Sequence, residues 1–371
     1  MPLVDDIEML ILYASIGSGH RTAAEAIAQQ AADVGGAGLR VRLVDLLTLT
    51  DVGMTDRLSS VPSATGISSA YDAVWGADWL SAPVGGTLRA LRPLLFPRLR
   101  AQISPDTRVV VSTHALGAIL TADLLRAWRV AVLTDFMPHG FWPRQVDRIC
   151  VPTQDARVEL ELRGFPASTI ELTGVPVREQ FAHAPSREAA RVTLGIDGDR
   201  RVALVVAGAR DPGPYAQLAQ RIPAVVSALV GSGMLSVVLT GTNTPLAEQL
   251  AAEFGESVRV VPYTDDVATL IAASDVVVAK PGGSIVSESI ACGRPLILLS
   301  RGSGQERANS AYLEKAGAAI VAENDDRLRD ALAGSLSTAS QQLMAAEKIA
   351  MPGAARHVAR VALEPFEPRA D

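Results

Sequence analysis

The sequence predicts an α/β protein built from two doubly wound parallel sheets. Short apolar runs, many of them β-branched, alternate with segments of helical character through both halves of the chain, as strand–helix–strand units require. The chain has 371 residues, which is enough for two domains that each form a core. Its hydrophobic content of 48% suits strands that are buried on both faces.

The strands are predicted from these apolar runs. In the first half we expect them near residues 9–15, 40–45, 108–112, 130–134 and 148–151, and in the second half near 202–207, 235–240, 258–261, 275–279, 295–299 and 319–321. The segment 174–186 is rich in Pro and polar residues, which is typical of a linker. We therefore predict an N-terminal domain over 1–176, a C-terminal domain over 177–352 and a tail over 353–371.

One segment, VVVAKPGGSIVSESIACGRP at 276–295, combines a strand, a glycine turn and a helix start. Gly282 and Gly283 allow the backbone to approach a ligand closely, and Ser284 is predicted as the N-cap of the helix. Unpaired amides of the first helical turn favour a phosphate. Glu288, one turn beyond Ser284, can accept hydrogen bonds from two adjacent sugar hydroxyls. The alternative is an ordinary strand-to-helix turn whose glycines serve packing and whose glutamate is solvated.

A second loop follows the first predicted strand and reads IGSGH at 16–20, with a helix expected to start near Arg21. It departs from the dinucleotide-binding fingerprint because Thr22 occupies the third glycine position, although Asp45 could be mistaken for the acidic partner. An NAD site is therefore disfavoured. His20 lies at a helix N-terminus, where the positive dipole favours the neutral imidazole that a general base needs. A structural histidine is the alternative.

A basic segment is found at Leu88–Leu99, reading LRALRPLLFPRL, and is followed by Arg100. Its arginines alternate with leucines and Phe96, a pattern that fits a surface dipping into anionic lipid. The alternative is a core-facing helix, broken by Pro93 and Pro97, whose arginines extend outward to solvent.

The net charge and the hydropathy of the chain bear on nucleic-acid binding, on membrane spans and on the cellular location. A net charge of −6 argues against general nucleic-acid binding. Apolar runs are too short or too interrupted by charge to span a bilayer, and residues 1–7 include acidic side chains where a signal peptide would begin with basic ones. We expect a cytoplasmic protein that can associate peripherally with the inner face of the cell membrane.

The sequence offers little for a metal or a disulfide. Cys150 and Cys292 lie in separate predicted domains without any zinc-ligand spacing, so buried reduced thiols are expected. The acidic pair of Asp197 and Asp199 resembles the carboxylate pairs with which some enzymes hold a metal, but it falls in a polar turn before a strand, where a solvated turn is the better interpretation. We predict no metal site.

Five motifs together resemble the glycosyltransferase family 28 group, especially the monogalactosyl- and glucosyl-diacylglycerol synthases, and the resemblance covers nearly the whole chain. They are SIGSGHRTAAEAIA (15–28), VVVSTH (109–114), VLTDFMPHGFWPRQVDRICVPT (132–153), LTGVPVREQF (172–181) and AKPGGSIVSESIACGRPLIL (279–298). The resemblance implies an α/β fold of the GT-B class: two Rossmann-like doubly wound domains facing a cleft, with the acceptor mainly on the first domain and the nucleotide sugar mainly on the second. It also implies that the tail packs back toward the first domain.

The resemblance further implies an enzyme, a hexosyltransferase. It would transfer a hexose with inversion from a UDP-sugar to an acceptor hydroxyl, and the expected acceptor is diacylglycerol or a related lipid. The reaction would need no cofactor and no divalent ion. A base must remove the acceptor proton while the leaving diphosphate is stabilised. The residues assigned by resemblance and position are, as catalytic candidates, His20, Asp135 and His139; on the acceptor side, Gly17, Gly19 and His114; and for the donor nucleotide, Gly208, Arg210, Tyr263, Val267, Gly282, Gly283, Ser284, Glu288, Gln305, Glu306 and Asn309.

One departure from the family keeps other functions open. Where the family has a glycine-rich loop, this chain reads AGARDPG at 207–213. Arg210 could bind the diphosphate, or Asp211 could pair with Arg210 and block the site. A catalytically silent nucleotide-sugar-binding protein is therefore one alternative. A glycosyltransferase acting on a soluble natural product or a cell-wall lipid precursor is another.

Overall fold

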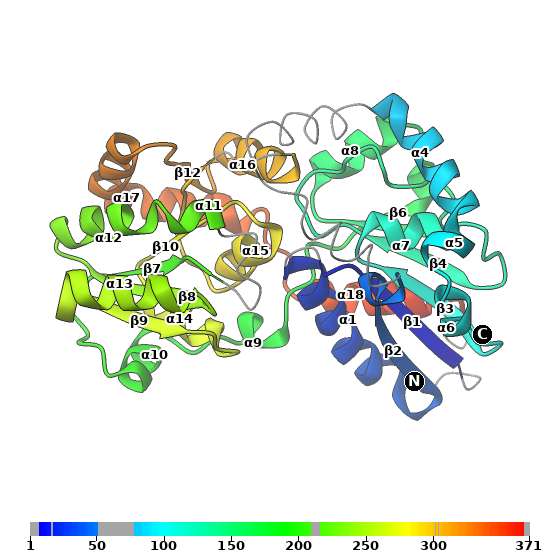
Figure 1. Ribbon diagram of the computed structural model, residues 1–371, viewed down its shortest axis with the longest axis horizontal. Coiled ribbons are helices and arrows are strands. Elements are labelled where there is room, and N and C mark those ends of the chain that lie inside the picture. Colours follow the sequence, from blue (N-terminus) through cyan, green and yellow to red (C-terminus); the bar gives the residue numbers. More distant parts are fainter. Residues whose placement is uncertain are drawn as a thin grey trace. The chain divides into compact units, whose positions relative to one another are not determined.

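The computed structural model describes residues 7–15, 18–50, 78–208, 216–300, 302 and 304–366 (Figure 1), with the backbone alone over 78–82, 216–217 and 334–337. The chain divides into two compact units. The first comprises Met1–Arg178, Ser303–Gln305 and Gly353–Asp371, and the second comprises Glu179–Gly302 and Glu306–Pro352.

The first unit is built on a six-stranded sheet in the order β2-β1-β3-β4-β5-β6, in which every pair of neighbours is parallel. Its strands are β1 (Ile7–Tyr13), β2 (Leu39–Asp45), β3 (Thr107–Ser112), β4 (Trp128–Val132), β5 (Arg148–Val151) and β6 (Ile170–Leu172). Five of these lie at or within two residues of the predicted positions. The sequence did not predict β6, because three residues are too few to show a periodicity.

Helices cover the sheet of the first unit. They are α1 (Gly19–Gly35), α4 (Asp78–Ala90), α5 (Arg92–Leu95), α6 (Leu99–Gln102), α7 (Ala115–Leu120), α8 (Gln154–Leu162) and α18 (Ala354–Leu363). Helices α1 and α18 lie side by side (Figure 1) and bury their apolar faces against β1, β3 and β4. The C-terminal helix therefore completes the core of the first unit.

Helix α18 is also tied to the sheet by polar contacts. The indole Nε1 of Trp128 in β4 donates to the backbone oxygen of Val361 at 3.2 Å. The Arg148 guanidinium, in β5, forms an ion pair with Glu364 at 3.0 Å and lies 5.0 Å from the centroid of the Trp128 ring. These contacts fix the C-terminal helix over the strands that lead to the site described below.

The second unit has its own six-stranded parallel sheet, in the order β12-β11-β10-β7-β8-β9. Its strands are β7 (Val202–Val206), β8 (Leu235–Gly241), β9 (Val258–Pro262), β10 (Val276–Ala279), β11 (Leu296–Leu298) and β12 (Ile320–Val321). The helices are α9 (Glu179–Ala182), α10 (Arg187–Leu194), α11 (Ala216–Ala219), α12 (Ile222–Gly231), α13 (Thr244–Phe254), α14 (Val267–Ala273), α15 (Gly283–Ala291), α16 (Gln305–Lys315) and α17 (Asp325–Glu347). The predicted doubly wound α/β class is confirmed for each unit.

Each sheet has one point where the strand order reverses direction. In the first unit it lies between β1 and β3, and in the second between β7 and β10. Open parallel sheets bind ligands in the crevice outside the carboxyl ends of their strands at such a switch point, because the loops on the two sides diverge there. The topology thus marks one ligand-binding edge in each unit. No helix in the described part of the chain is both long and apolar enough to cross a bilayer.

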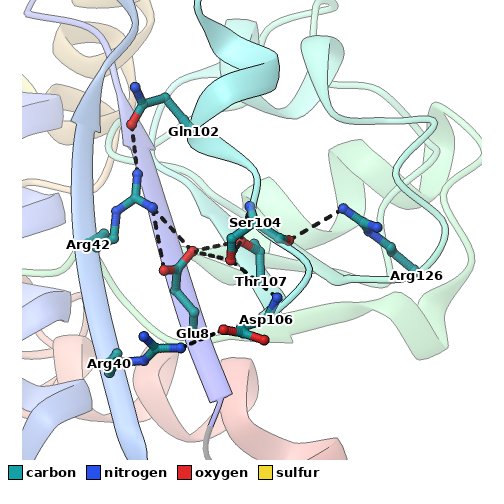
Figure 2. Close-up of polar contacts among 8 residues, drawn as sticks. All are labelled: Glu8, Arg40, Arg42, Gln102, Ser104, Asp106, Thr107 and Arg126. Carbon is teal, nitrogen blue, oxygen red and sulfur yellow. Dashed lines mark hydrogen bonds and ion pairs between the residues drawn. The ribbon is translucent and has the colours of Figure 1, made fainter.

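The opposite edge of the first sheet is held by a polar cluster centred on Glu8, near the start of β1 (Figure 2). The Glu8 side chain is only 6% exposed. It accepts hydrogen bonds from the Thr107 hydroxyl at 2.7 Å and the Ser104 hydroxyl at 3.3 Å, and the Arg42 guanidinium lies 3.4 Å from both of its oxygens. Glu8 thereby connects β1 to β2 and β3 at the edge away from the switch point.

Replacing Glu8 with alanine is expected to destabilise the fold by about 2–4 kcal/mol, because the change leaves Arg42 without its buried counterion. Chemical denaturation measures the loss. Asp106→Ala is the matched control: Asp106 pairs with Arg40 at 2.9 Å, but both side chains are 61% exposed, so the cost should stay below about 1 kcal/mol. Equal effects of the two changes would contradict the structural role given to Glu8.

Candidate functional site

The described acceptor-side and catalytic candidates follow strands β1, β3 and β4 of the first unit. His20 is the second residue of α1, just after β1, and His114 follows β3. Asp135 and His139 follow β4. Helix α1 begins at Gly19, two residues before the predicted start near Arg21, so His20 lies in its first turn. Gly17 lies outside the described residues.

His20 is held by two threonines. Its Nδ1 lies 2.7 Å from the backbone oxygen of Thr113 and 3.0 Å from the Thr134 hydroxyl, and the Thr113 hydroxyl donates to the His20 carbonyl at 2.9 Å. A backbone oxygen can only accept, so Nδ1 carries the ring proton and the lone pair of the neutral imidazole is on Nε2. Burial lowers the pKa of His20 below 6.5, against the opposing influence of the Asp135 carboxylate and the Thr113 carbonyl. His20 therefore offers an unprotonated Nε2 at neutral pH.

His114 has the opposite tautomer. It is the N-cap of α7, and its Nδ1 accepts a hydrogen bond from the Leu116 amide at 3.1 Å. The ring is edge-on to His20, with centroids 4.6 Å apart and an interplanar angle of 84°. Burial, together with repulsion from any charge on His20 or His139, holds the pKa of His114 well below its usual value. The neutral ring therefore carries its proton on Nε2.

His139 completes this group of three imidazoles. Its Nδ1 accepts from the Phe141 amide at 3.2 Å, and its ring stacks on Trp142 with centroids 5.5 Å apart. Burial first, then the charges of His20 and Arg163, lowers the pKa of His139 to about 3. Because the Nδ1 lone pair of His139 accepts the hydrogen bond from the Phe141 amide, it is not available to take a proton. This favours His20 over His139 as the base.

Asp45, the residue that could have suggested an NAD site, is engaged within the first unit. Its carboxylate accepts from the Ser15 amide at 3.2 Å, from the Ser15 hydroxyl and from the Leu47 amide at 3.0 Å. Asp45 therefore supports the loop after β1.

Several of the candidate donor residues follow β7 and β10, the strands on the two sides of the switch point of the second unit. Gly208 follows β7, and a Cβ at this position would lie 2.0 Å from the backbone oxygen of Thr240, so only glycine fits. Arg210 and Asp211 lie outside the described residues. On the other side of the switch point, β10 leads through Pro281 into α15.

The start of α15 differs from the prediction. Gly282, in an extended conformation, is the N-cap, and α15 begins at Gly283 without a side-chain cap. Ser284 is not the N-cap, because it already lies inside the helix and its hydroxyl donates to Glu288 at 3.0 Å. The first helical hydrogen bond runs from Val286 N to Gly282 O, so the amides of the first turn have no acceptor within the helix.

Two further donor candidates contact the loop before α15. The Lys280 ammonium pairs with Glu306 at 2.6 Å, and the buried Asn309 side chain donates to the Pro281 oxygen at 3.1 Å. Both Glu306 and Asn309 belong to α16. The Asn309 amide thus supports the loop that leads into α15, and its contact with the donor stays a prediction.

Three remaining donor candidates are less tightly grouped. Gln305 is the first residue of α16 and is grouped with the first unit. Tyr263 follows β9, is 39% exposed and donates to Asp265 at 2.8 Å. Val267 is the first residue of α14, after the Asp266 cap.

Sequence reasoning missed Thr113 and Thr134, which orient His20. Both lie in motifs that were recognised, VVVSTH and VLTDFMPHG. The signal was a threonine within two residues of the end of each buried strand, but a hydroxyl near a strand end does not by itself reveal its partner.

Two family models match the chain. The glycosyltransferase family 28 C-terminal domain matches residues 214–361, and monogalactosyldiacylglycerol (MGDG) synthase matches residues 87–177. The resemblance found in the sequence is thereby confirmed.

The chain is also similar, at modest sequence identity, to curated diacylglycerol glucosyltransferases. A processive diacylglycerol beta-glucosyltransferase of Bacillus subtilis (strain 168) is 29% identical over 211 residues, which is 56% of this chain and 54% of that protein. One of Bacillus cytotoxicus is 28% identical over 280 residues, covering 72% of this chain and 70% of that protein. The chain spans about half the length of most curated relatives it matches.

Solved structures share the fold. MurG of Acinetobacter baumannii has a TM-score of 0.60 at 17% identity, covering 96% of this chain and 99% of that one. MnaA of S. aureus, solved with UDP, has a TM-score of 0.61 at 13% identity, covering 98% and 99%. These matches confirm the GT-B fold class.

Proposed function

We propose that this chain, which carries the C-terminal domain of glycosyltransferase family 28, transfers a hexose from a UDP-sugar to the hydroxyl of diacylglycerol or a related lipid. The observation that carries the proposal is the imidazole of His20, whose Nδ1 is held by Thr113 and whose Nε2 is open at the switch point of the first unit. The lipid acceptor is supported by the match to MGDG synthase and by the curated relatives.

The acceptor step needs a base within reach of the hydroxyl. Nε2 of His20 takes the acceptor proton as that oxygen attacks the anomeric carbon. The Thr113 carbonyl holds the proton on Nδ1 and keeps the ring oriented, and the nearby Asp135 carboxylate favours the imidazolium that forms. Attack on the side opposite the diphosphate inverts the configuration of the sugar.

The donor step needs a site for a departing diphosphate. The amides of Gly283 and Ser284 at the start of α15, a helix without a side-chain cap, are donors, and the positive end of the helix dipole favours the negative charge that develops there. Glu288, one turn along α15, accepts hydrogen bonds from the ribose hydroxyls. We infer that these groups take the place of a divalent ion.

The test is UDP release from UDP-glucose, UDP-galactose and UDP-N-acetylglucosamine, each with and without diacylglycerol in anionic vesicles, and in the presence of EDTA. Release that requires vesicles, and that one donor supports best, is the expected result. Release with a soluble acceptor alone would indicate a natural-product transferase instead. UDP binding without any release, even in the absence of EDTA, would indicate the silent binding protein and overturn the proposal.

A lipid acceptor requires the first unit to reach a membrane. The basic segment Leu88–Arg100 has some of its apolar side chains in the core and others exposed, so it combines the core-facing and the membrane-facing interpretations. Phe96 and Leu99 are buried in the core, whereas Leu91 and Leu94 are 43% and 70% exposed. Arg100 is exposed as well. We infer that the exposed leucines enter the headgroup region and that the arginines attract anionic lipid.

Changing Leu91 and Leu94 together to glutamate is expected to weaken binding to anionic vesicles at least about tenfold, because two apolar insertions are lost and two negative charges are added. Vesicle co-sedimentation measures this. Leu162→Glu is the matched control, since Leu162 is 78% exposed but lies in α8. Unchanged sedimentation of the double variant would exclude this segment as the membrane contact.

A further inference from the structure

His20 and His114 form a pair whose proton positions are set by the backbone. His20 donates from Nδ1 to a carbonyl, while His114 accepts at Nδ1 from an amide. Neither ring can change tautomer without losing its backbone hydrogen bond. The pair therefore offers two different groups through Nε2: a lone pair on His20 and an N–H on His114.

Both Nε2 atoms are open to a ligand. In the described part of the chain, neither atom makes a hydrogen bond with the protein, and both histidines are only partly buried. The ring centroids are 4.6 Å apart, which is short enough for neighbouring oxygens of one small ligand to meet both rings.

An acceptor that fits this pair has one hydroxyl and, close to it, an oxygen without a proton. Diacylglycerol has this pattern: its free hydroxyl lies next to a carbon that carries an ester, and an ester carbonyl can only accept. We propose that His114 donates a hydrogen bond from Nε2 to an ester carbonyl of the lipid acceptor while His20 deprotonates the neighbouring hydroxyl. The inference rests on the proposed function and makes His114 a residue that selects acylated glycerol.

The chain offers a clean variant for the test. Because His114 caps α7 through Nδ1, His114→Asn keeps an acceptor for the Leu116 amide but removes the Nε2 donor. His114→Ala removes both. Thermal unfolding should therefore show a lower Tm for His114→Ala than for His114→Asn, which separates the cap from the ligand contact.

The experiment compares diacylglycerol with a dialkylglycerol, whose ether oxygens are poorer acceptors than ester carbonyls, in the same vesicles. The wild-type chain should prefer the diacyl lipid in kcat/KM by about tenfold, the value of one hydrogen bond. His114→Asn should lose this preference through a higher KM for the diacyl lipid, with unchanged UDP binding. Transfer in which His114→Asn keeps the wild-type preference would overturn the inference alone, whereas no transfer to either lipid by the wild-type chain would overturn the proposed function as well.

Discussion

His20→Ala is expected to lower kcat at least about a hundredfold, the usual contribution of a general base, while the Kd for UDP stays nearly unchanged. The reason is that Nε2 of His20 is the acceptor-side lone pair in the proposed reaction, and His20 lies in the first unit, whereas the proposed UDP site lies in the second. Stopped UDP-release assays at saturating donor and acceptor measure kcat, and calorimetry measures UDP binding.

His183→Ala is the control for this prediction. His183 is another histidine of the chain, with a side chain that is 75% exposed in the second unit, and its replacement should leave kcat within about twofold. The wild-type profile of kcat/KM against pH should lose activity only below pH 6.5, because burial lowers the pKa of His20 and the neutral base persists to more acidic pH. Near-normal turnover by His20→Ala would remove His20 from the mechanism.

Glu288→Ala is expected to weaken UDP binding about a hundredfold. Glu288 is only 6% exposed and already accepts from Ser284 at 3.0 Å. A carboxylate that also accepts two ribose hydroxyls makes charge-assisted hydrogen bonds, which are worth about 1.5–3 kcal/mol each before the cost of desolvation. Calorimetric titration with UDP measures the change.

Two variants at the same place sharpen the Glu288 experiment. Glu288→Gln keeps the shape of the side chain but removes the charge, so an intermediate loss of affinity is expected. Ser284→Ala removes the hydrogen bond to Glu288 while leaving the carboxylate, and should cost less than Glu288→Gln. A Glu288→Ala chain that is folded and binds UDP as the wild type does would contradict the ribose assignment.

Most of the sheet architecture could be predicted because buried parallel strands are continuous apolar runs. Strands such as Val202–Val206 and Val276–Ala279 are buried throughout, so their composition alone reveals them. The short strand Ile170–Leu172 could not be found this way. Helix starts were harder, since Gly282 caps α15 with backbone geometry alone, and a serine two residues later is the stronger sequence signal.

The site was predicted as a set of residues but not as an arrangement. His20 and His114 are far apart in the sequence, and their contact depends on the pairing of β1 with β3. Their tautomers depend on one carbonyl and one amide, for which the sequence has no signal. In the same way, the sequence has no signal for the hydrogen bond that the Asn309 amide donates to the Pro281 oxygen.

Transfer of the sugar to lipid can be measured by following the sugar itself. The chain is incubated with radiolabelled UDP-hexose and diacylglycerol vesicles, the lipid is extracted, and label in the lipid phase is counted beside the UDP released. The wild-type chain is expected to give labelled glycolipid in a one-to-one ratio with UDP, and His20→Ala almost none. UDP release with all of the label left as free sugar in water, or label in lipid that does not depend on His20, would contradict the proposed reaction.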